Sequence, residues 1–593
     1  MERAVEQLLK ENRRRLDEIN KPFDPITGEG SVGERIQVHL PDFTIPIQYV
    51  PAEMLQNGLV RLCVECGTLR SVVTKLRSMD PDLPAITEEE MQNEIKKVSN
   101  RLIRVRWYYD FPFWAAMMAK IKNKGGGANV RFRLNRPQRT KLIPAFEEDR
   151  LQNKPIRIIV DKTRQWGCST GTEMYFGWLQ LVREIGLNSL IVGHVSATSA
   201  EVEDMYKTLL EDYPVEALVE EDDVVNENDP TWVGVGGKQN IHRVPQRNCK
   251  IKLGTAMAPE NARGGDYNLV HCTEVALWLT ADGHDPAAIV QGATGGMLYA
   301  PNTMIVLEST AKGIGNYFHI EYTAAVEGRS QFKAIFVSWF EVDQNSIPFR
   351  DEWSRERFAE KLWRNRNNGS ADDDRHESGE YLYWLWEQGA TLEAINWYII
   401  ERTKYSGSAA MREEYPTTWQ ESFVNSGANV FDNTLVEKLR KTCKPARWKG
   451  ELEGSVALGS QGTTNGSWFD RRGIGNKQLL EDLHFCEDQQ GHLEIWSKPE
   501  VSDDDEVVKN RYLVVVDIGG RGDKADWSVI CVFDRIGMME GDKPAVVAQW
   551  YGHIDMDLLA WKAAQIAKWY DNDLYYMMMT DNLVTREDFL LKT

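Results

Sequence analysis

The sequence predicts an α/β fold, because short apolar runs alternate with helical stretches. Helical periodicity covers, for example, Thr172–Ile185 and Ala200–Leu210. Strands alternating with helices favour a mostly parallel sheet with helices on both faces. The four apolar runs that predict strands are Ile156–Val160, Leu190–Gly193, Tyr267–Cys272 and Met304–Leu307.

A second α/β unit is expected further along the chain. With 593 residues the chain is too long for one hydrophobic core. The stretch 450–465 is dense in Gly, Ser and Thr, which is typical of a linker. A new apolar run, Tyr512–Val516, follows it and predicts the first strand of the second unit.

Composition indicates a soluble globular protein, with 42% hydrophobic and 27% charged residues. No apolar run approaches the roughly 18 residues that span a bilayer. The charged N-terminus lacks the apolar core of a signal peptide, so we expect a cytosolic protein without membrane contact. Among eight cysteines, Cys63 and Cys66 form a C-x-x-C pair without a second pair at zinc-like spacing, which predicts reduced thiols.

The net charge of −19 argues against broad nonspecific coating of DNA. It leaves room for a local basic channel, because positive charge is clustered between residues 131 and 141. A solvated face explains this cluster at least as well as a DNA track. Its members are Arg131, Arg133, Arg136, Arg139 and Lys141.

The segment Asp161–Thr170 lies between a predicted buried strand and a predicted helix, the context of a phosphate-binding loop. Its match to the Walker A pattern G-x-x-x-x-G-K-[ST] is partial. Gly167 fills the second glycine position and Ser169 the magnesium-ligating position. Cys168 stands in the lysine position, while Lys162 stands at the loop's entrance, from where a lysine can still reach phosphates. These residues alone also fit a plain strand-turn-helix.

Three further segments supply groups that an ATP site needs. Glu274 follows an apolar strand and is the candidate general base of a Walker B motif, with Thr273 where an aspartate commonly assists the metal. Glu308, Ser309 and Thr310 end another strand, where polar groups can sense hydrolysis. Simpler interpretations are a strand-end glutamate in solvent for Glu274 and a helix N-cap for Ser309 or Thr310. Gln138 has an amide that can bond adenine through both its donor and its acceptor.

These motifs, in this order, resemble the large terminase subunit of tailed bacteriophages, over about residues 105 to 593. The K-x-R-Q-x-G-x-S-T form of the loop is specific to one branch of these packaging motors, in which the entrance lysine is an accepted variant. The segments that carry the resemblance are Leu134–Gln138, Lys162–Thr170, Val270–Trp278, Glu308–Gly313 and Glu414–Thr418, continued by Glu421–Gly427 and Val430–Asp432.

The resemblance implies an ATPase with an associated metal-dependent endonuclease domain. It places Glu274, Lys162 and Arg164 in catalysis, with Arg263 a guess for an arginine acting in a neighbouring subunit. Magnesium would be held by Ser169 and Glu274. The residues implied to contact ATP are Gln138, Lys162, Arg164, Gln165, Gly167, Cys168, Ser169, Thr170, Glu308, Ser309 and Thr310.

The resemblance also implies the architecture, the partners and the location. The fold would be a P-loop (ASCE-type) ATPase domain followed by a partial RNase H-like nuclease domain. Partners would be double-stranded DNA, the portal protein, the small terminase subunit and copies of the chain in a ring, in the host cytoplasm. The expected divisions are 1–104, an extension of unknown role, 105–365, the ATPase, 366–465, a helical and linker region, and 466–593, the nuclease.

For the nuclease, Asp517 ends the Tyr512–Asp517 strand and is the expected first ligand of Mg²⁺ or Mn²⁺. Asp526, in the turn that follows, is a weaker candidate. The second acid is expected after the apolar run Tyr575–Met579. The family shows Glu-x-Asn there, but here Thr580 takes the glutamate position and Asp581 follows one residue later. Side chains alternate on a strand, so this shift changes the geometry unless the strand end bends.

Two other functions fit the same residues. A helicase-like nucleic-acid translocase would unwind a duplex, whereas a packaging motor moves it without strand separation. A nucleotide-binding protein that assembles on a capsid or portal without hydrolysis is consistent with Cys168 and Thr273.

We expect weak or absent nuclease activity, because of Thr580 and because the family's third acid normally lies beyond the distance at which this chain ends, at Thr593. The measurement is cleavage of plasmid DNA with Mn²⁺. Robust cleavage that is lost on Asp517→Ala would refute this expectation.

Overall fold

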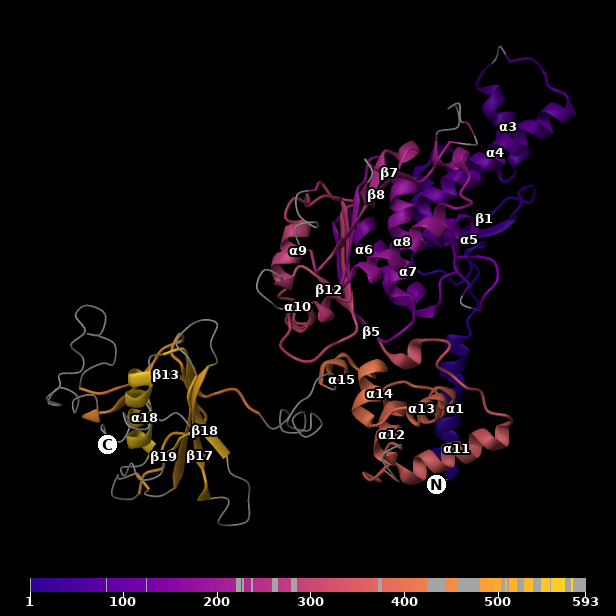
Figure 1. The fold of residues 1–593 in the computed structure, drawn as a ribbon. Helices are drawn as coiled ribbons and strands as arrows, with labels where there is room; N and C mark the ends of the chain where they lie inside the picture. The colour runs from indigo at the N-terminus through magenta and orange to yellow at the C-terminus, as the bar shows by residue number, and fades with distance from the viewer. Residues whose placement is uncertain are drawn as a thin grey trace. The chain divides into compact units, whose positions relative to one another are not determined.

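The structure is a computed structural model that divides into two compact units, Met1–Asn433 and Thr434–Thr593. Each unit is described by itself (Figure 1). The residues described are 2–80, 83–123, 125–219, 226, 229–235, 238–258, 265–278, 285–371, 376–424, 443–455, 480–502, 507–508, 511–519, 527–536, 545–554, 556–570 and 577–579.

The first unit is built on an eight-stranded sheet in the order β12-β5-β11-β10-β6-β9-β8-β7. The six strands from β12 to β9 run parallel, and β8 and β7 extend the edge antiparallel. The mostly parallel sheet that the sequence predicts is thereby confirmed, with all four predicted strands in it. The strands are β5 (Ile156–Lys162), β6 (Ser189–Gly193), β7 (Val233–Val235), β8 (Lys238–Val244), β9 (Cys249–Thr255), β10 (Leu269–Thr273), β11 (Met304–Ser309) and β12 (Lys333–Val337).

Both faces of the central strands β5, β6, β10 and β11 are buried, which explains why these strands are mostly apolar. Alternate residues point to opposite faces: Ile158 and Val160 join one core, and Ile159 joins the other. The first core is closed by α5 (Phe111–Met118), α6 (Ile143–Leu151), α7 (Cys168–Trp178) and α8 (Ser196–Leu210), and the second by α9 (Pro286–Thr294) and α10 (Tyr317–Val326). Figure 1 shows these helices on the two sides of the sheet.

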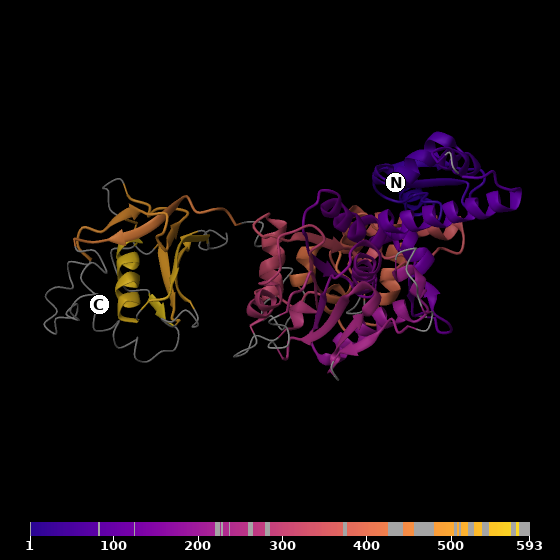
Figure 2. The same cartoon turned by 90° about the horizontal axis from the view of Figure 1, so that it is seen from above.

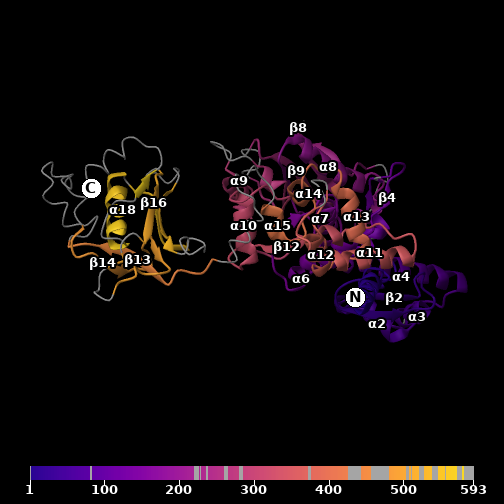
Figure 3. The same cartoon turned by 90° about the horizontal axis from the view of Figure 1, so that it is seen from below.

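A helical layer follows the sheet in sequence and includes the N-terminal helix. Helix α1 (Glu2–Ile19) packs on α11, and the buried amide of Asn12 donates to Glu393 over 2.9 Å (Figures 1 and 3). Residues at the start of the chain therefore share one core with residues near 390. The other helices of this layer are α11 (Glu352–Asn365), α12 (Gly379–Glu387), α13 (Leu392–Arg402), α14 (Ser408–Glu414) and α15 (Trp419–Val424).

Residues 35 to 109 form a small separate core, in which helices pack on a two-stranded hairpin (Figure 2). Helix α4 continues across residue 104, where the sequence suggested a division. The elements are β1 (Arg35–His39), β2 (Ile47–Pro51), α2 (Gly58–Cys66), α3 (Leu69–Ser78) and α4 (Glu88–Tyr109). Short elements elsewhere in the unit are β3 (Lys120–Ile121), β4 (Val130–Arg131) and two π-helical turns, Gln138–Leu142 and Leu179–Arg183.

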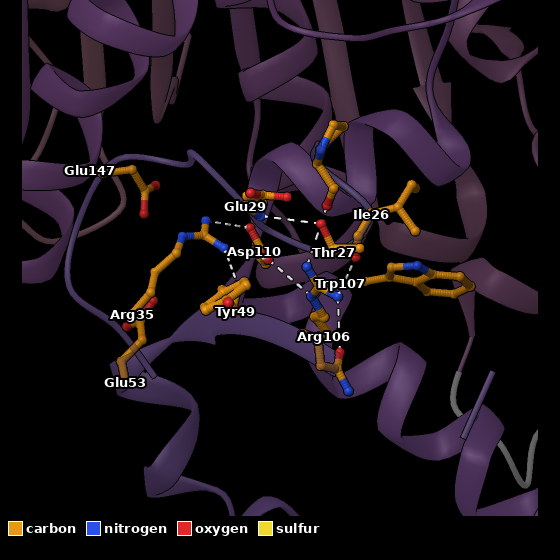
Figure 4. A network of polar contacts seen from close by, with 12 residues as sticks. Ile26, Thr27, Glu29, Arg35, Tyr49, Glu53, Arg106, Trp107, Asp110 and Glu147 are labelled. Carbon is orange, nitrogen blue, oxygen red and sulfur yellow. Dashed lines mark hydrogen bonds and ion pairs between the residues drawn. The ribbon is translucent and has the colours of Figure 1, made fainter. Parts of the chain in front are cut away.

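A buried carboxylate joins this small core to the main sheet domain. Asp110 lies between α4 and α5 and is fully buried. It binds Arg35 over 2.9 Å and Arg106 over 3.0 Å, and Arg106 also donates to the carbonyl of Ile26 over 2.7 Å (Figure 4). One acid thus balances two guanidinium groups. A cavity of about 510 Å³ borders this network, and its lining residues all lie between Phe23 and Leu151.

The second unit has a seven-stranded sheet in the order β14-β13-β15-β18-β17-β16-β19, with α18 packed on β16 and β13. Strands β16 and β17 form an antiparallel pair, and β19 joins β16 in parallel. The elements are β13 (Trp448–Glu453), β14 (His484–Glu487), β15 (Leu493–Ile495), β16 (Tyr512–Asp517), β17 (Ser528–Asp534), β18 (Ala545–Gly552), α18 (Met556–Tyr570) and β19 (Met577–Met579).

No helix in the described ranges combines the length and the hydropathy needed to cross a bilayer.

Replacing Asp110 by alanine should destabilise the first unit by about 3–5 kcal/mol, because two buried guanidinium groups lose their counter-charge. Calorimetric unfolding of the full chain measures the shift. The control is Glu94→Ala, which removes an exposed ion pair with Lys97 and should cost less than about 1 kcal/mol. An Asp110→Ala shift no larger than the control would contradict the role assigned to this carboxylate.

Candidate functional site

The loop between β5 and α7 is held open by its backbone and by a neighbouring segment. Gln165 and Gly167 adopt left-handed conformations, with φ of 62° and 81°. Asn135 donates to the carbonyl of Trp166 over 2.6 Å, and Gln138 donates to the carbonyl of Gly167 over 2.7 Å. A Cβ at Gly167 would lie 2.9 Å from the Gln138 amide nitrogen, so a side chain there would disturb this clamp. Helix α7 begins directly after this clamp, and the backbone amides of its first turn have no partner within the helix.

Gln138 therefore contacts the loop itself. Its amide oxygen accepts from the backbone N–H of Asn135 over 3.0 Å, while its amide nitrogen holds Gly167. Both functions of the amide that the sequence assigned to adenine are engaged within the protein in this structure.

Lys162 is the last residue of β5, and its ammonium lies between two carboxylates. Its Nζ is 3.1 Å from Glu274 and 3.3 Å from Glu308. Burial opposes the charge, but the two carboxylates outweigh it and raise the pKa of Lys162. The lysine is therefore cationic and positioned at the end of the strand that leads into the loop. Cys168, which stands in the Walker lysine position, is buried, and burial raises its thiol pKa well above the ordinary value.

Glu308 is the centre of the polar contacts beneath the loop. The hydroxyls of Ser169 and Thr273 both donate to its Oε1, that of Thr273 over 2.9 Å. His271 lies 3.1 Å from the same oxygen. Burial alone would raise the pKa of Glu308, but Lys162 and His271 overcome it and hold the pKa well below the ordinary value. This carboxylate is fully buried and ionised.

No sequence pattern indicates the ion pair that lies behind Glu308. Glu173, on α7, lies 2.5 Å from Nδ1 of His271, on β10, and neither side chain is exposed. Burial would lower the pKa of His271, yet the two glutamates raise it to about 9. From the sequence alone, a histidine within an apolar strand is interpreted as a core residue. Only its two acidic neighbours, 98 residues before it and on the next strand, identify it as a cation.

Glu274 differs from Glu308 in exposure and in backbone. Its side chain is 26% exposed, whereas that of Glu308 is not exposed at all. It follows β10 with φ of 55°, a left-handed conformation that costs a non-glycine residue about 1–3 kcal/mol. This strained turn directs the carboxylate to Lys162, at the same end of the sheet as the loop. Of the two carboxylates beside Lys162, Glu274 is the more accessible.

The Glu414–Thr418 motif contacts the loop. Arg164 forms an ion pair with Glu414, and Thr163 donates to the Glu414 carbonyl over 3.1 Å. Lys312, which follows the Glu308–Thr310 segment, pairs with Glu413 over 2.8 Å. The end of α14 thus holds both segments.

Asp161, one residue before Lys162, connects the loop strand to α15. The Ser422 hydroxyl lies 2.5 Å from Asp161 Oδ2 and 2.7 Å from the carbonyl of Trp419. One hydroxyl proton cannot serve two acceptors, so a protonated Asp161 fits both distances. Burial raises the pKa of Asp161 to about 7.

Some of the remaining predicted residues lie in the described parts of the chain, and others do not. Ser309 accepts the N–H of Ala276 and donates to the carbonyl of Thr310, which ties β11 to the segment after β10. Thr170 contacts the sulfur of Met205, on α8. Asp517 is exposed at the end of β16, opposite Val529. Arg263, Asp526, Thr580 and Asp581 lie outside the described residues.

No family model matches the sequence, and no curated protein matches it. Several solved structures are similar to the chain, and they are phage large terminases. The large terminase of bacteriophage HK97 aligns with 10% identity and a TM-score of 0.36, over 81% of this chain and 82% of that one. The large terminase of the thermophilic bacteriophage D6E, in complex with ADP, aligns with 9% identity and a TM-score of 0.28, over 77% and 80%.

The ATPase domain of the Thermus phage P74-26 large terminase aligns with 14% identity and a TM-score of 0.26, over 44% of this chain and 88% of that one. The similar structures thus come from the family that the motifs resemble. With identities and TM-scores this low, an assignment of function rests on the residues of the site.

The Asp161→Asn variant should gain stability relative to the parent as pH rises from about 4 to 7, and then keep a constant difference. The unfolded carboxyl ionises near its ordinary pKa of about 3.9. The folded one ionises only near 7, so the stability that its protonated form contributes is lost over this range. Urea unfolding at several pH values measures the difference. Asp204→Asn, at an exposed position on α8, is the control and should show no such trend; a flat Asp161→Asn profile would contradict the buried proton.

Proposed function

We propose that the chain is an ATPase whose nucleotide phosphates bind at the loop 161–170, and that it drives double-stranded DNA into a viral procapsid. One observation carries the proposal: the Lys162 ammonium lies beside the loop, between Glu274 and Glu308, at the end of the central parallel strands. Nucleotides bind at this end of such sheets, where helix N-termini offer free amides.

The charge and the exposure of each group in the site indicate its role in the proposed reaction. The amides at the start of α7 and the helix dipole attract phosphate oxygens. Lys162, freed from one of its two carboxylates, is the cation for the β- and γ-phosphates. Glu274, the accessible acid, accepts a proton from the attacking water or orients it.

The site also suits a magnesium ion. The Ser169 hydroxyl and the Glu308 carboxylate, oxygen groups of the kind that Mg²⁺ prefers, meet there. Glu308 Oε2 is buried and has no partner with hydrogen-bond geometry among the described residues. The Cys168 thiol lies near this carboxylate and contributes to its low pKa. When bound, Mg²⁺ neutralises charge on the β- and γ-phosphates.

Movement would start from the contacts that join the loop to the helical layer. Arg164 with Glu414, Lys312 with Glu413 and Ser422 with Asp161 connect α14 and α15 to the two strands that border the nucleotide. In the proposed cycle, hydrolysis changes the loop and the Glu308–Thr310 segment, and these contacts pass the change to α14 and α15. The motor would act as a ring on the portal, with the small terminase subunit. In the second unit, Asp517 and Asp581 would hold Mg²⁺ or Mn²⁺ for cutting DNA, and with Thr580 in the glutamate position we expect this activity to be weak or absent.

Replacing Glu274 by alanine should lower ATP turnover by about 10²- to 10⁴-fold, the range expected for loss of a general base. ATP binding should persist, because Lys162 and the α7 amides remain. Phosphate release and equilibrium binding of a fluorescent ATP analogue measure the two effects, and Glu356→Ala, at an exposed position on α11, is the control.

Parent and Glu274→Ala proteins with equal, negligible turnover would contradict the ATPase. If both still bound ATP, a non-hydrolysing assembly protein would be supported instead. ATP-dependent strand separation of a duplex would favour a helicase-like translocase.

A further inference from the structure

The end of β10 lacks the acid that the proposed ATPase needs there. In P-loop enzymes the nucleotide's magnesium is held by the loop Ser or Thr together with an aspartate on a neighbouring strand. Ser169 supplies the hydroxyl, but Thr273 stands where the aspartate is expected. Threonine carries no charge, so the site needs a carboxylate from another position.

The order of the strands supplies one. Strand β11 lies between β5 and β10, and Glu308 is paired with Val160 on one side and with Thr273 on the other. Its carboxylate therefore lies beneath the loop, next to the position that Thr273 leaves uncharged.

The contacts of this carboxylate fit the missing role. Ser169 Oγ, the loop hydroxyl expected on magnesium, donates to Glu308. Thr273 Oγ1 donates to the same oxygen over 2.9 Å. The other oxygen, Oε2, is buried and has no partner with hydrogen-bond geometry among the described side chains. A fully buried carboxylate oxygen without such a partner is costly unless it serves a ligand.

A purely structural role explains these contacts less well. In a structural role Glu308 would only balance His271 and Lys162, but each of these cations has a second acid, Glu173 and Glu274 respectively. Neither cation accounts for the bonds from Ser169 and Thr273. His271 and Glu173 fix Glu308 from the side away from the loop, which makes them positioning residues.

We propose that Glu308, assisted by Thr273, is the magnesium-orienting acid of this site, displaced from the end of β10 to the end of β11. The inference rests on the proposed ATPase and names a residue for a specific step in it. Glu274 then remains available as the base, so the two acidic functions come from two different strands.

The test measures the magnesium-dependent and the magnesium-independent parts of nucleotide binding separately. Binding of a non-hydrolysable fluorescent ATP analogue is measured with and without Mg²⁺, for the parent, Glu308→Gln and the double variant Glu308→Gln with Thr273→Asp. Loss of a group that orients a metal's ligands typically costs about 10- to 100-fold in metal affinity. We expect Glu308→Gln to lose the magnesium-dependent gain by this factor and to keep its magnesium-free affinity. The double variant, which returns a carboxylate to β10, should recover part of the gain.

Two further measurements keep the result interpretable. Glu393→Gln neutralises another buried glutamate, on α13, and should keep the full magnesium dependence. If Glu308→Gln does not fold, Glu308→Asp keeps the charge but draws it back from Ser169. It should show a smaller loss that Thr273→Asp restores.

The outcomes distinguish failure of this inference from failure of the proposed function. Full magnesium dependence in a folded Glu308→Gln or Glu308→Asp variant overturns the inference and leaves the ATPase intact. Equal losses with and without Mg²⁺, unrestored by Thr273→Asp, also overturn it, since they indicate a structural role. A parent protein that binds no analogue under either condition contradicts the proposed function itself.

Discussion

The ion cluster beneath the loop is the interaction on which the rest of the site depends. Five ionisable side chains meet there: Lys162, His271, Glu173, Glu274 and Glu308. Charges removed from water are costly unless each has a partner at close range. Here two cations alternate with three acids along a chain from α7 to the end of β10. This chain of ion pairs connects α7 to the ends of β5, β10 and β11.

The sheet order makes this cluster possible. Because β11 lies between β5 and β10, its last residues are next to both the loop strand and the strand of the candidate base. Parallel pairing brings all three carboxyl ends to one edge, and the register sets Glu308 beside Thr273. A carboxylate lost from one strand can thus be supplied by its neighbour. In the proposed site, the position of Glu308 in the sheet compensates for the departure of the linear motif from its pattern.

The helical layer extends the site beyond the sheet. Residues 413 to 422 contact the loop strand, the loop and the segment after β11, which lie 101 to 261 residues away in sequence. The ion pairs at this contact are only partly buried, so their energies are small and they can exchange partners. The buried Asp161–Ser422 contact is more rigid. In the proposed motor, one buried contact and several exchangeable ones would let this layer move relative to the nucleotide.

Several features were predictable from the sequence alone, since they follow from local patterns. Apolar runs of strand length gave the central strands, and the residue types from Lys162 to Ser169 gave the loop. Glu274 was recognisable because it directly follows an apolar strand. The β7–β9 edge was not predicted, because its strands carry mixed polar and apolar residues. The extent of α7 was also misjudged: it begins at Cys168 and ends in a π-helical turn.

Tertiary structure decided what each acid is paired with. Nothing near His271 in sequence reveals that Glu173 and Glu308 hold it as a cation, and nothing near Asp161 reveals Ser422. The sequence placed Glu308 among the nucleotide contacts, but its bond to Ser169 depends on which strands are neighbours. Strand order and register are long-range properties, set by how the faces of the whole sheet are buried. For that reason local sequence determined the chemical groups of this protein, and only the fold determined which of them act together.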